Sequence, residues 1–520
     1  MRKLAILLLA GAESWAHFPF VLPQAGGRSA EMVLSETLSV DPEVDVKMAA
    51  RTQLKLRDAN GEERPLELVL EGNTYRLATP GQGARVIYGQ TDLGVMSNPR
   101  APSPYWLVYH PKTILGPVSG SSDKFLLNLP VELVPEEQGG KVRLRLLARG
   151  RPLAGAEVTV IPPSLEQQKM KTDSEGWVGP FLQAGRYGAW ARFWETAEGE
   201  REGKSYRQVR HYATLVFDLF PPVKTMAPMP EAAASFGAVV AGAHVYVYGG
   251  HIADTHQYST EAVTGGFYRL NLGGGQWEKL PSGPALQGMN LAADEGGVYR
   301  VGGMAPRNPP GRKTDNHSVS SVARFVLDRG TWESLPDLPE PRSSHDVGLV
   351  GGKLFVVGGW NMRGSEPPLW SKKMFVLDFN TAGARWEELP QPFERRALIA
   401  AALDHRLFVL GGILASGAVS QDVDIYDVRE GKWKKGPALP GGPMDSFAPA
   451  AAVYRGRLYV CLGDGRIYRL NEAEGRWEDV AQVSPRVAHR MVAIEEGLLV
   501  LGGARKGKNL NTVELVVLKP

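Results

Sequence analysis

Short apolar strands that end in a pair of glycines recur along the C-terminal part of the chain. Intact copies occupy residues 245–250, 298–303, 354–359, 407–412 and 498–503, and a degenerate copy occupies 458–464. In the first five repeats a second apolar strand follows, and then a tryptophan: Trp277, Trp332, Trp386, Trp433 or Trp477. A repeat of roughly fifty residues that contains several strands predicts a β-propeller.

These copies resemble the kelch repeat over about residues 223–520. Paired glycines allow positive φ angles where neighbouring blades crowd together. A tryptophan on the outermost strand is large enough to cover the adjacent blade. The resemblance implies an all-β fold with a six-bladed kelch propeller.

The two ends of the repeat region suggest how the propeller closes. The last repeat has a third strand at 513–518 but no tryptophan strand after it. Residues 224–230 precede the first repeat and are similar to residues 332–336, with Met226 in place of the tryptophan. We therefore expect residues 223–228 to form the outer strand of the sixth blade, which would leave no open edge between the first and last blades.

Alternating apolar and polar positions also fill the first 220 residues, where no helical period is sustained. Strand patterns occur at 31–40, 52–57, 66–70, 74–78, 84–89, 105–110, 141–148, 156–161, 185–194 and 211–219. Short strands at this spacing with intervening turns are typical of β-sandwiches. We expect two sandwiches of immunoglobulin-like type, at 17–130 and 131–220, ahead of the propeller at 221–520.

The first sixteen residues have the pattern of a secretory signal peptide. Arg2 and Lys3 precede the apolar run 4–12, and 14–16 form a small-x-Ala cleavage site, with a rival site ending at Ala12. The apolar run is too short to span a bilayer as a helix. We therefore expect an exported protein that is not embedded in the membrane, located in the periplasm or outside the cell.

The composition limits the classes of partner and the disulfide bonds that we expect. The formal net charge is +3, with 22% charged residues, so no nucleic-acid partner is expected. The single cysteine, Cys461, cannot form an internal disulfide and is compatible with an oxidising compartment.

The N-terminal half has a second resemblance. Residues 16–18, 150–156, 172–177 and 210–214 are similar to motifs of an exported β-sandwich family of mostly unassigned function. Some members of that family accompany nickel or cobalt uptake systems. The resemblance therefore implies export and suggests metal binding.

Cleavage after Ala16 would make His17 the first residue. Its α-amine and imidazole could then chelate one metal, and nitrogen ligands of this kind favour Cu(II) or Ni(II). A tight site needs a second imidazole, for which His211 and His110 are the candidates. Alternatively, His17 faces solvent and His211 makes a structural hydrogen bond.

Polar and aromatic residues gather in two sets of propeller loops that we expect at one end of the blades. The candidate ligand-binding residues are His251, Arg342, His345, Trp360, Asn361, Arg395, Arg486 and His489. Guanidinium groups bind carboxylates or sulfates in a bidentate way, and a tryptophan could stack on a sugar. The arginines are also part of the repeat pattern, so they could instead brace the blades.

No metalloprotease, phosphate-loop or nucleophile-elbow motif is present, and no catalytic residue is assigned. Copper-radical oxidases with a kelch propeller need a cysteine linked to tyrosine, and Cys461 lies within a strand. The leading hypothesis is an exported protein that binds a glycan or a protein on the propeller face. One rival is an enzyme acting on an acidic sugar, since exported kelch proteins similar to this one include a sialic-acid mutarotase. The other is a metal-binding accessory protein that uses His17.

Overall fold

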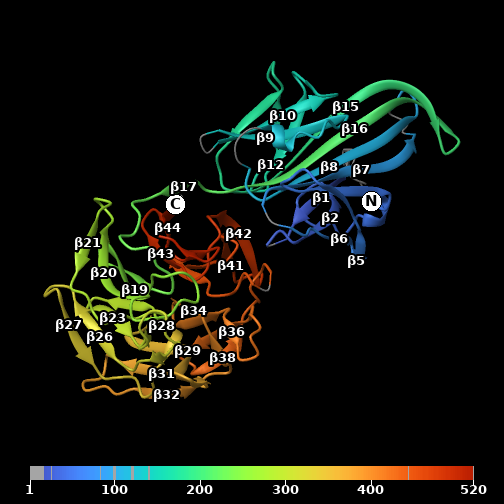
Figure 1. Ribbon diagram of the computed structural model, residues 1–520. Coiled ribbons are helices and arrows are strands. Elements are labelled where there is room, and N and C mark those ends of the chain that lie inside the picture. The colour runs from blue at the N-terminus through green and yellow to red at the C-terminus, as the bar shows by residue number, and fades with distance from the viewer. Residues whose placement is uncertain are drawn as a thin grey trace, which may run out of the picture. The chain divides into compact units, whose positions relative to one another are not determined.

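The computed structural model describes residues 17–24, 26–81, 83–97, 101–118, 122–138, 141–442 and 444–518. Within these ranges the protein is built from strands, with two short 3-10 helices, η1 (Val46–Ala49) and η2 (Ser122–Phe125). The chain divides into two compact units, Met1–Phe220 and Pro221–Pro520 (Figure 1). Among the described residues, no helix has the length and apolar character needed to cross a membrane. The expected all-β fold is confirmed.

The C-terminal unit is a ring of six antiparallel blades (Figure 1). From the innermost strand outward they are β18 (Gly237–Ala241), β19 (His244–His251), β20 (Val263–Asn271), β21 (Trp277–Leu280); β22 (Leu291–Asp294), β23 (Gly297–Val301), β26 (Val322–Val326), β27 (Thr331–Leu335); β28 (Ser343–Val350), β29 (Lys353–Arg363), β31 (Lys373–Asp378), β32 (Glu387–Pro390); β34 (Ile399–Leu403), β35 (Arg406–Leu410), β37 (Val423–Asp427), β38 (Lys432–Lys435); β39 (Ala450–Tyr454), β40 (Arg457–Cys461), β41 (Arg466–Asn471), β42 (Arg476–Gln482); and β43 (Arg490–Ile494), β44 (Gly497–Leu501), β47 (Val513–Val517), β17 (Val223–Thr225). Each innermost strand contacts the next, and β43 contacts β18, so the ring is closed.

The outer strand of the sixth blade comes from the start of this unit, as predicted. Strand β17 pairs antiparallel with β47, and Val223 lies opposite Val516. The expected alignment was wrong by three residues, because Val223 rather than Met226 occupies the position held by tryptophan in the other blades. In blade one the equivalent pair is Leu270 with Trp277.

The five tryptophans tie neighbouring blades together in the same way. Each indole N–H donates to a backbone carbonyl of the preceding blade. The acceptor lies four residues after the position of that blade that aligns with the tryptophan. The pairs are Trp277 with Ala227 (3.1 Å), Trp332 with Pro281 (2.9 Å), Trp386 with Pro336 (2.8 Å), Trp433 with Pro390 (3.1 Å) and Trp477 with Pro437 (3.0 Å). The repeat therefore provides both an apolar cover and a specific bond between blades.

A ring of backbone hydrogen bonds surrounds the propeller axis. Six residues, one just before each innermost strand or at its start, donate their N–H groups to one another in a closed circle. The bonds run Ser235 to Ala488 (2.9 Å), Gly288 to Ser235 (2.8 Å), Ser344 to Gly288 (2.6 Å), Ala397 to Ser344 (2.8 Å), Ala448 to Ala397 (3.1 Å) and Ala488 to Ala448 (3.2 Å). We call these residues the axial ring.

All six residues of the axial ring have φ between 45° and 67°, although only Gly288 is a glycine. This left-handed conformation is unfavourable for residues with a side chain. The surrounding blades must therefore enforce it. The ring borders a central cavity of only about 50 Å³, so the axis is nearly filled at this level.

The N-terminal unit has three layers. The middle sheet has the order β13 (Gln168–Lys171), β12 (Glu157–Ile161), β15 (Gly185–Arg201), β16 (Lys204–Leu219), β8 (Tyr105–Leu115), β7 (Arg85–Met96), β3 (Thr52–Arg57), β4 (Glu63–Leu66). One outer sheet contains β1 (Phe18–Pro23), β2 (Ser29–Ser35), β6 (Thr74–Ala78) and β5 (Val69–Glu71), and the other contains β9 (Val131–Gln138), β10 (Lys141–Ala148), β11 (Arg151–Pro152) and β14 (Trp177–Phe181).

Adjacent residues of β7 show that the outer sheets cover opposite faces of the middle sheet. Ile87 packs in the core with the β1–β2 side, whereas Val86 packs in the core with β9 and β10. Strands β8 and β16, from the two expected sandwiches, pair in parallel in the middle sheet. The regions 17–130 and 131–220 therefore share one sheet instead of having a separate pair of sheets each.

Candidate functional site

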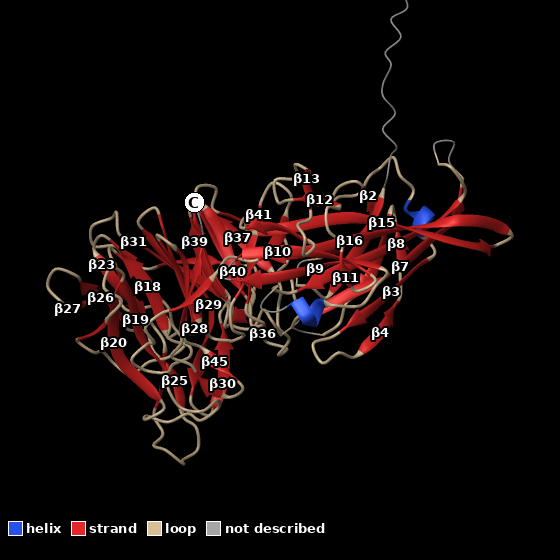
Figure 2. Cartoon of the chain, turned by 90° about the horizontal axis from the view of Figure 1, so that it is seen from above, coloured by secondary structure: helices blue, strands red, loops and turns tan. Residues whose placement is uncertain are grey.

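Neighbouring strands of a blade are antiparallel, so two kinds of loop emerge at one end of the propeller, which we call the loop face. Connecting loops join the second strand of a blade to the third and are 252–262, 302–321, 364–372, 411–422, 462–465 and 502–512. Incoming loops lead into the innermost strands and are 226–236, 281–290, 336–342, 391–398, 436–442 with 444–449, and 483–489. Figure 2 shows β25 (Asn316–Ser318), β30 (Glu366–Trp370) and β45 (Ala504–Arg505) together at this end. Loops held on a rigid scaffold are common places for binding residues.

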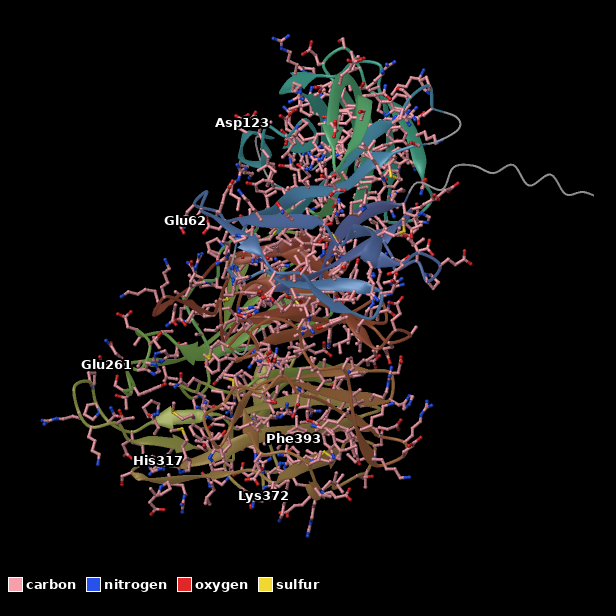
Figure 3. All side chains as sticks on the ribbon, turned by 90° about the vertical axis from the view of Figure 1, so that its right-hand side faces the viewer. Glu62, Asp123, Glu261, His317, Lys372 and Phe393 are labelled. Carbon is pink, nitrogen blue, oxygen red and sulfur yellow. The ribbon has the colours of Figure 1, made fainter. Side chains whose placement is uncertain are left out.

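Several loops on this face are bound to their neighbours. The Asn509 amide donates to the carbonyl of His251 at 2.8 Å, and the Asn308 amide donates to the carbonyl of Tyr258 at 2.7 Å. The N–H of Met362 donates to Ser318 Oγ at 2.9 Å. Glu261, His317 and Lys372, labelled in Figure 3, mark three of the connecting loops. The interlocked loops provide a preformed surface.

The structure corrects the roles predicted for three arginines. Arg342, Arg395 and Arg486 have at most 2% of their surface exposed. Each guanidinium binds the third strand of its own blade or the turn before it. Arg342 donates to the carbonyl of Lys373 at 2.8 Å, Arg395 pairs with Asp424 at 2.5 Å, and Arg486 pairs with Glu514. The bracing role applies to these arginines, and they do not present their charge to a ligand.

His345 and His489 are also buried, and both line the central cavity that the axial ring borders. Their role in ligand binding stays a prediction. They are 2% and 1% exposed and directly follow residues of the axial ring. Phe236, Met289, Leu398 and Pro449 occupy the same position in the other blades. The side chains at this position pack against the paired glycines; Gly302 and Gly503 leave room for His345 and His489.

His251, Trp360 and Asn361 lie where the loop face meets the second strands. His251 is buried, and its Nε2 lies 3.1 Å from the carbonyl of Asp254. Trp360 and Asn361 are half-buried near the end of β29, and Trp360 lies opposite Trp370 of the paired strand β30. Of the predicted ligand residues, Trp360 and Asn361 are the two that retain substantial exposure.

Arg396 is a candidate binding residue that the sequence analysis did not select. Its Cζ lies 4.1 Å from the ring centroid of Trp360 and 5.9 Å from that of Trp370. Burial lowers the pKa of Arg396, and the neighbouring Tyr258 of blade one opposes that shift. The repeat pattern holds one signal for this residue: Arg395 aligns with the bracing Arg342 and Arg486, and at the next position none of the other blades has an arginine.

Exposed basic residues lie on two other loops of the loop face. Arg307, Arg312 and Lys313 extend from the blade-two loop, and Arg505 and Lys506 from the blade-six loop. No side chain among these five forms an ion pair within the described ranges. The unpaired charge on these loops is therefore positive.

The three predicted metal ligands do not come together. His17 Nε2 lies 3.3 Å from Asp41 Oδ2, whereas His110 Nε2 lies 3.0 Å from His211 Nδ1 inside the N-terminal unit. Burial lowers the pKa of His110 to about 3, with His211 adding to the shift. Across the described part of the chain, no group of three or more His, Cys, Asp or Glu residues could hold a metal ion. The predicted site is therefore corrected to a buried histidine pair that excludes His17.

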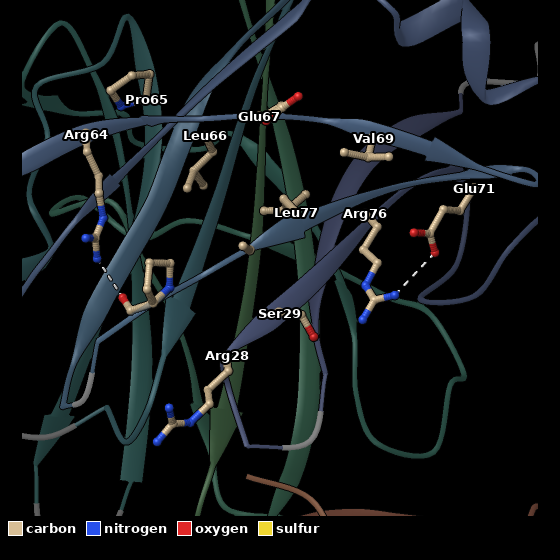
Figure 4. A pocket seen from close by; sticks show the side chains of 12 residues that line it. Arg28, Ser29, Arg64, Pro65, Leu66, Glu67, Val69, Glu71, Arg76 and Leu77 are labelled. Carbon is tan, nitrogen blue, oxygen red and sulfur yellow. Dashed lines mark hydrogen bonds and ion pairs between the residues drawn. The ribbon is translucent and has the colours of Figure 1, made fainter. Parts of the chain in front are cut away.

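The N-terminal unit also has an open groove of about 610 Å³ between strands β4 and β5 (Figure 4). Arg64 donates to the carbonyl of Pro80 at 2.6 Å, and Arg76 lies 3.5 Å from Glu71. Its charged lining residues are Arg28, Arg64, Arg76, Glu67 and Glu71. Both signs of charge are present, so the groove does not select an anionic or a cationic ligand.

Comparisons with known proteins relate the C-terminal unit to kelch repeats. Residues 295–503 match the family model described as "KLHDC2/KLHL20/DRC7 Kelch-repeats domain". The chain is 31% identical over 201 residues to Kelch repeat and BTB domain-containing protein 12 of Danio rerio, an alignment that covers 36% of this chain and 31% of that protein. It is 33% identical over 171 residues to Kelch domain-containing protein 8B of Homo sapiens, covering 32% and 46%.

A solved structure, "Structure of YjhT", has a TM-score of 0.47 and 15% identity, and covers 56% of this chain and 97% of that one. The matches to the two curated relatives span less than half of their lengths. Residues 221–520 therefore form a six-bladed β-propeller, and residues 295–503 of it match kelch repeats.

Proposed function

We propose that this chain is a binding protein whose loop face holds a protein partner. The observation that carries the proposal is the cluster of Arg396, Trp360 and Trp370 on interlocked loops. Arginine and tryptophan are the residue types that contribute most to the energy of protein interfaces. Leu369, next to this cluster, has 54% of its surface exposed and adds an apolar contact.

A glycan is the rival ligand, and an enzyme acting on an acidic sugar is a related alternative. Sugar recognition by stacking requires an open aromatic face. Trp360 faces Arg396, and its ring centroid is 5.4 Å from that of Trp370 in a T-shaped contact. This arrangement favours a protein partner over a stacked sugar. A metal-dependent function has less support, because His17 is separated from the buried histidine pair.

Export remains a prediction, because the expected signal peptide at 1–16 lies outside the described residues. If export occurs, the partner would be met in the periplasm or outside the cell. The proposal for the loop face does not depend on that location.

The test uses site-specific blocking. Burial raises the pKa of Cys461, whose side chain is fully buried, so the native thiol should resist maleimide. A Leu369→Cys variant carrying maleimide-polyethylene glycol would obstruct the loop face. Glu430→Cys, on an exposed turn at the opposite end, is the matched control.

A phage-displayed library of random dodecapeptides would be selected on the unmodified protein. We expect selected clones to lose at least about tenfold in affinity for the Leu369-blocked protein and to keep their affinity for the Glu430-blocked one. Selection of no clones, or equal binding to both blocked proteins, would refute a peptide-binding loop face.

A further inference from the structure

We propose that the partner carries an acidic peptide segment and that one of its carboxylates binds Arg396, an inference that rests on the proposed function. The guanidinium of Arg396 has no ion pair and no hydrogen bond to any described residue. Its Nε is buried without an acceptor. A partly buried cation without a counter-ion is costly to maintain, so its charge is available to an incoming anion.

The other arginines of the incoming loops show that the fold can provide such partners. Arg395, the adjacent residue, binds Asp424 and the carbonyl of Asp422. Arg486 binds Glu514 and the carbonyl of Gly502. The lack of an internal partner is therefore specific to Arg396 and does not follow from its loop.

The contact with Trp360 covers one face of the Arg396 guanidinium and leaves its N–H edge for a ligand. Trp360 lies against the guanidinium, with 4.1 Å between Cζ and the ring centroid. A stacked guanidinium keeps its N–H groups in its own plane, where they can donate two parallel hydrogen bonds to a carboxylate. A lysine at the same position could not reproduce this planar arrangement.

Tyr258 provides a second donor from blade one. Its phenol makes no hydrogen bond with the described residues, and its ring lies 5.5 Å from that of His251 at the loop face. Burial raises the pKa of Tyr258, and the charge of Arg396 opposes that shift. A protonated phenol can donate to a carboxylate oxygen. Arg396 and Tyr258 come from blades on opposite sides of the ring, so a ligand that touches both would lie across the axis.

The surrounding charges favour a segment with several carboxylates over an isolated one. Arg312 and Lys313 on the blade-two loop and Arg505 and Lys506 on the blade-six loop are exposed and lack ion pairs among the described residues. Like-signed charges around a binding site attract an oppositely charged partner and increase its association rate. Screening by salt should weaken this contribution.

The test is an array of random dodecapeptides containing Asp or Glu, beside an identical array in which Asn and Gln replace those residues. Sialylated glycans are printed on the same surface. Arg396→Gln removes the proposed anchor, and Tyr258→Phe removes the second donor. Arg429→Gln is the matched control, because it removes one exposed charge from a turn at the opposite end of the blades. Thermal unfolding checks that each variant is folded.

We expect the wild-type protein to retain acidic peptides and to bind their neutral counterparts at least about tenfold more weakly. Arg396→Gln should lose at least about tenfold in affinity, Tyr258→Phe about threefold to tenfold, and Arg429→Gln less than about threefold.

Equal binding of acidic and neutral peptides, or unchanged binding by folded Arg396→Gln, would overturn the inference. Retention of sialylated glycans without acidic peptides would overturn the peptide assignment. If neutral peptides bind and blocking at Leu369 prevents it, the proposed function stands while the carboxylate inference fails. Binding of no peptide on either array rejects both.

Discussion

The N–H of Ser235 donates to the carbonyl of Ala488 at 2.9 Å, and this bond joins the first blade to the last at the propeller axis. At the rim the same two ends of the propeller are joined by β17, which pairs with β47. The ring is therefore closed both at the axis and at the outer edge, by different parts of the chain. A preformed loop face depends on this closure, because neighbouring blades carry interlocked loops.

Removing residues 223–228 should lower the melting temperature of the propeller by at least about 5 °C, because β47 would lose its outer partner and become an open edge. Differential scanning calorimetry of the full chain measures the change. Lys224→Thr is the control, since the pairing of β17 uses its backbone. An unchanged transition after the deletion would contradict the role of β17 in closure.

Trp386→Phe should destabilise the propeller by about 1 kcal/mol beyond the effect of the lost ring area, because the indole donates to Pro336 at 2.8 Å. Trp194→Phe is the control, since Trp194 is 44% exposed in the other unit. The two variants are compared by calorimetry. Equal effects would show that the bond between blades contributes little.

Acid should destabilise the propeller through His489. Burial holds the pKa of His489 at about 3, below the ordinary value of 6.5. The unfolded chain therefore binds a proton that the folded chain does not bind between these values. The free energy of unfolding is therefore unaffected above pH 6.5 and decreases as the pH falls, by about 2 kcal/mol at pH 5.

Replacing His489 with leucine, the residue found at the equivalent position 398, should make the melting temperature less sensitive to pH between 7 and 4. His256→Leu is the control, because His256 is exposed on the loop face. An unaltered pH dependence in His489→Leu would rule out this histidine as the source.

The N-terminal unit has a buried ion pair that should be sensitive to removal of either member. Lys112 Nζ lies 3.0 Å from Glu132 Oε2, and both side chains are at most 1% exposed. Burial lowers the pKa of Lys112 to about 8, although Glu132 opposes the shift. Lys112→Met should destabilise the unit by about 3–5 kcal/mol, because Glu132 would be left unpaired.

A double variant, Lys112→Met with Glu132→Gln, should recover part of that loss, since it removes both charges. Calorimetry of the full chain compares the single and double variants. If the double variant is the less stable of the two, the cost does not come from an unpaired carboxylate.

Arg395 and Arg396 show what could not be predicted from the sequence. Repeat alignment places Arg395 in the incoming-loop position of Arg342 and Arg486, but it does not reveal that this position points into the blade. The same backbone directs Arg396 toward Trp360. The prediction therefore selected Arg395, which is bound inside its blade, and did not include Arg396, which lies against Trp360.

The sequence by itself determined the six-bladed ring and the strand that closes it, because paired glycines and tryptophans act within one repeat or between consecutive repeats. Only the tertiary structure decided which polar groups are free to bind. It buried His345 and His489, brought His110 to His211 from 101 residues away, and joined β8 to β16 in one sheet. These outcomes depend on contacts between segments far apart in the chain, which local patterns do not encode.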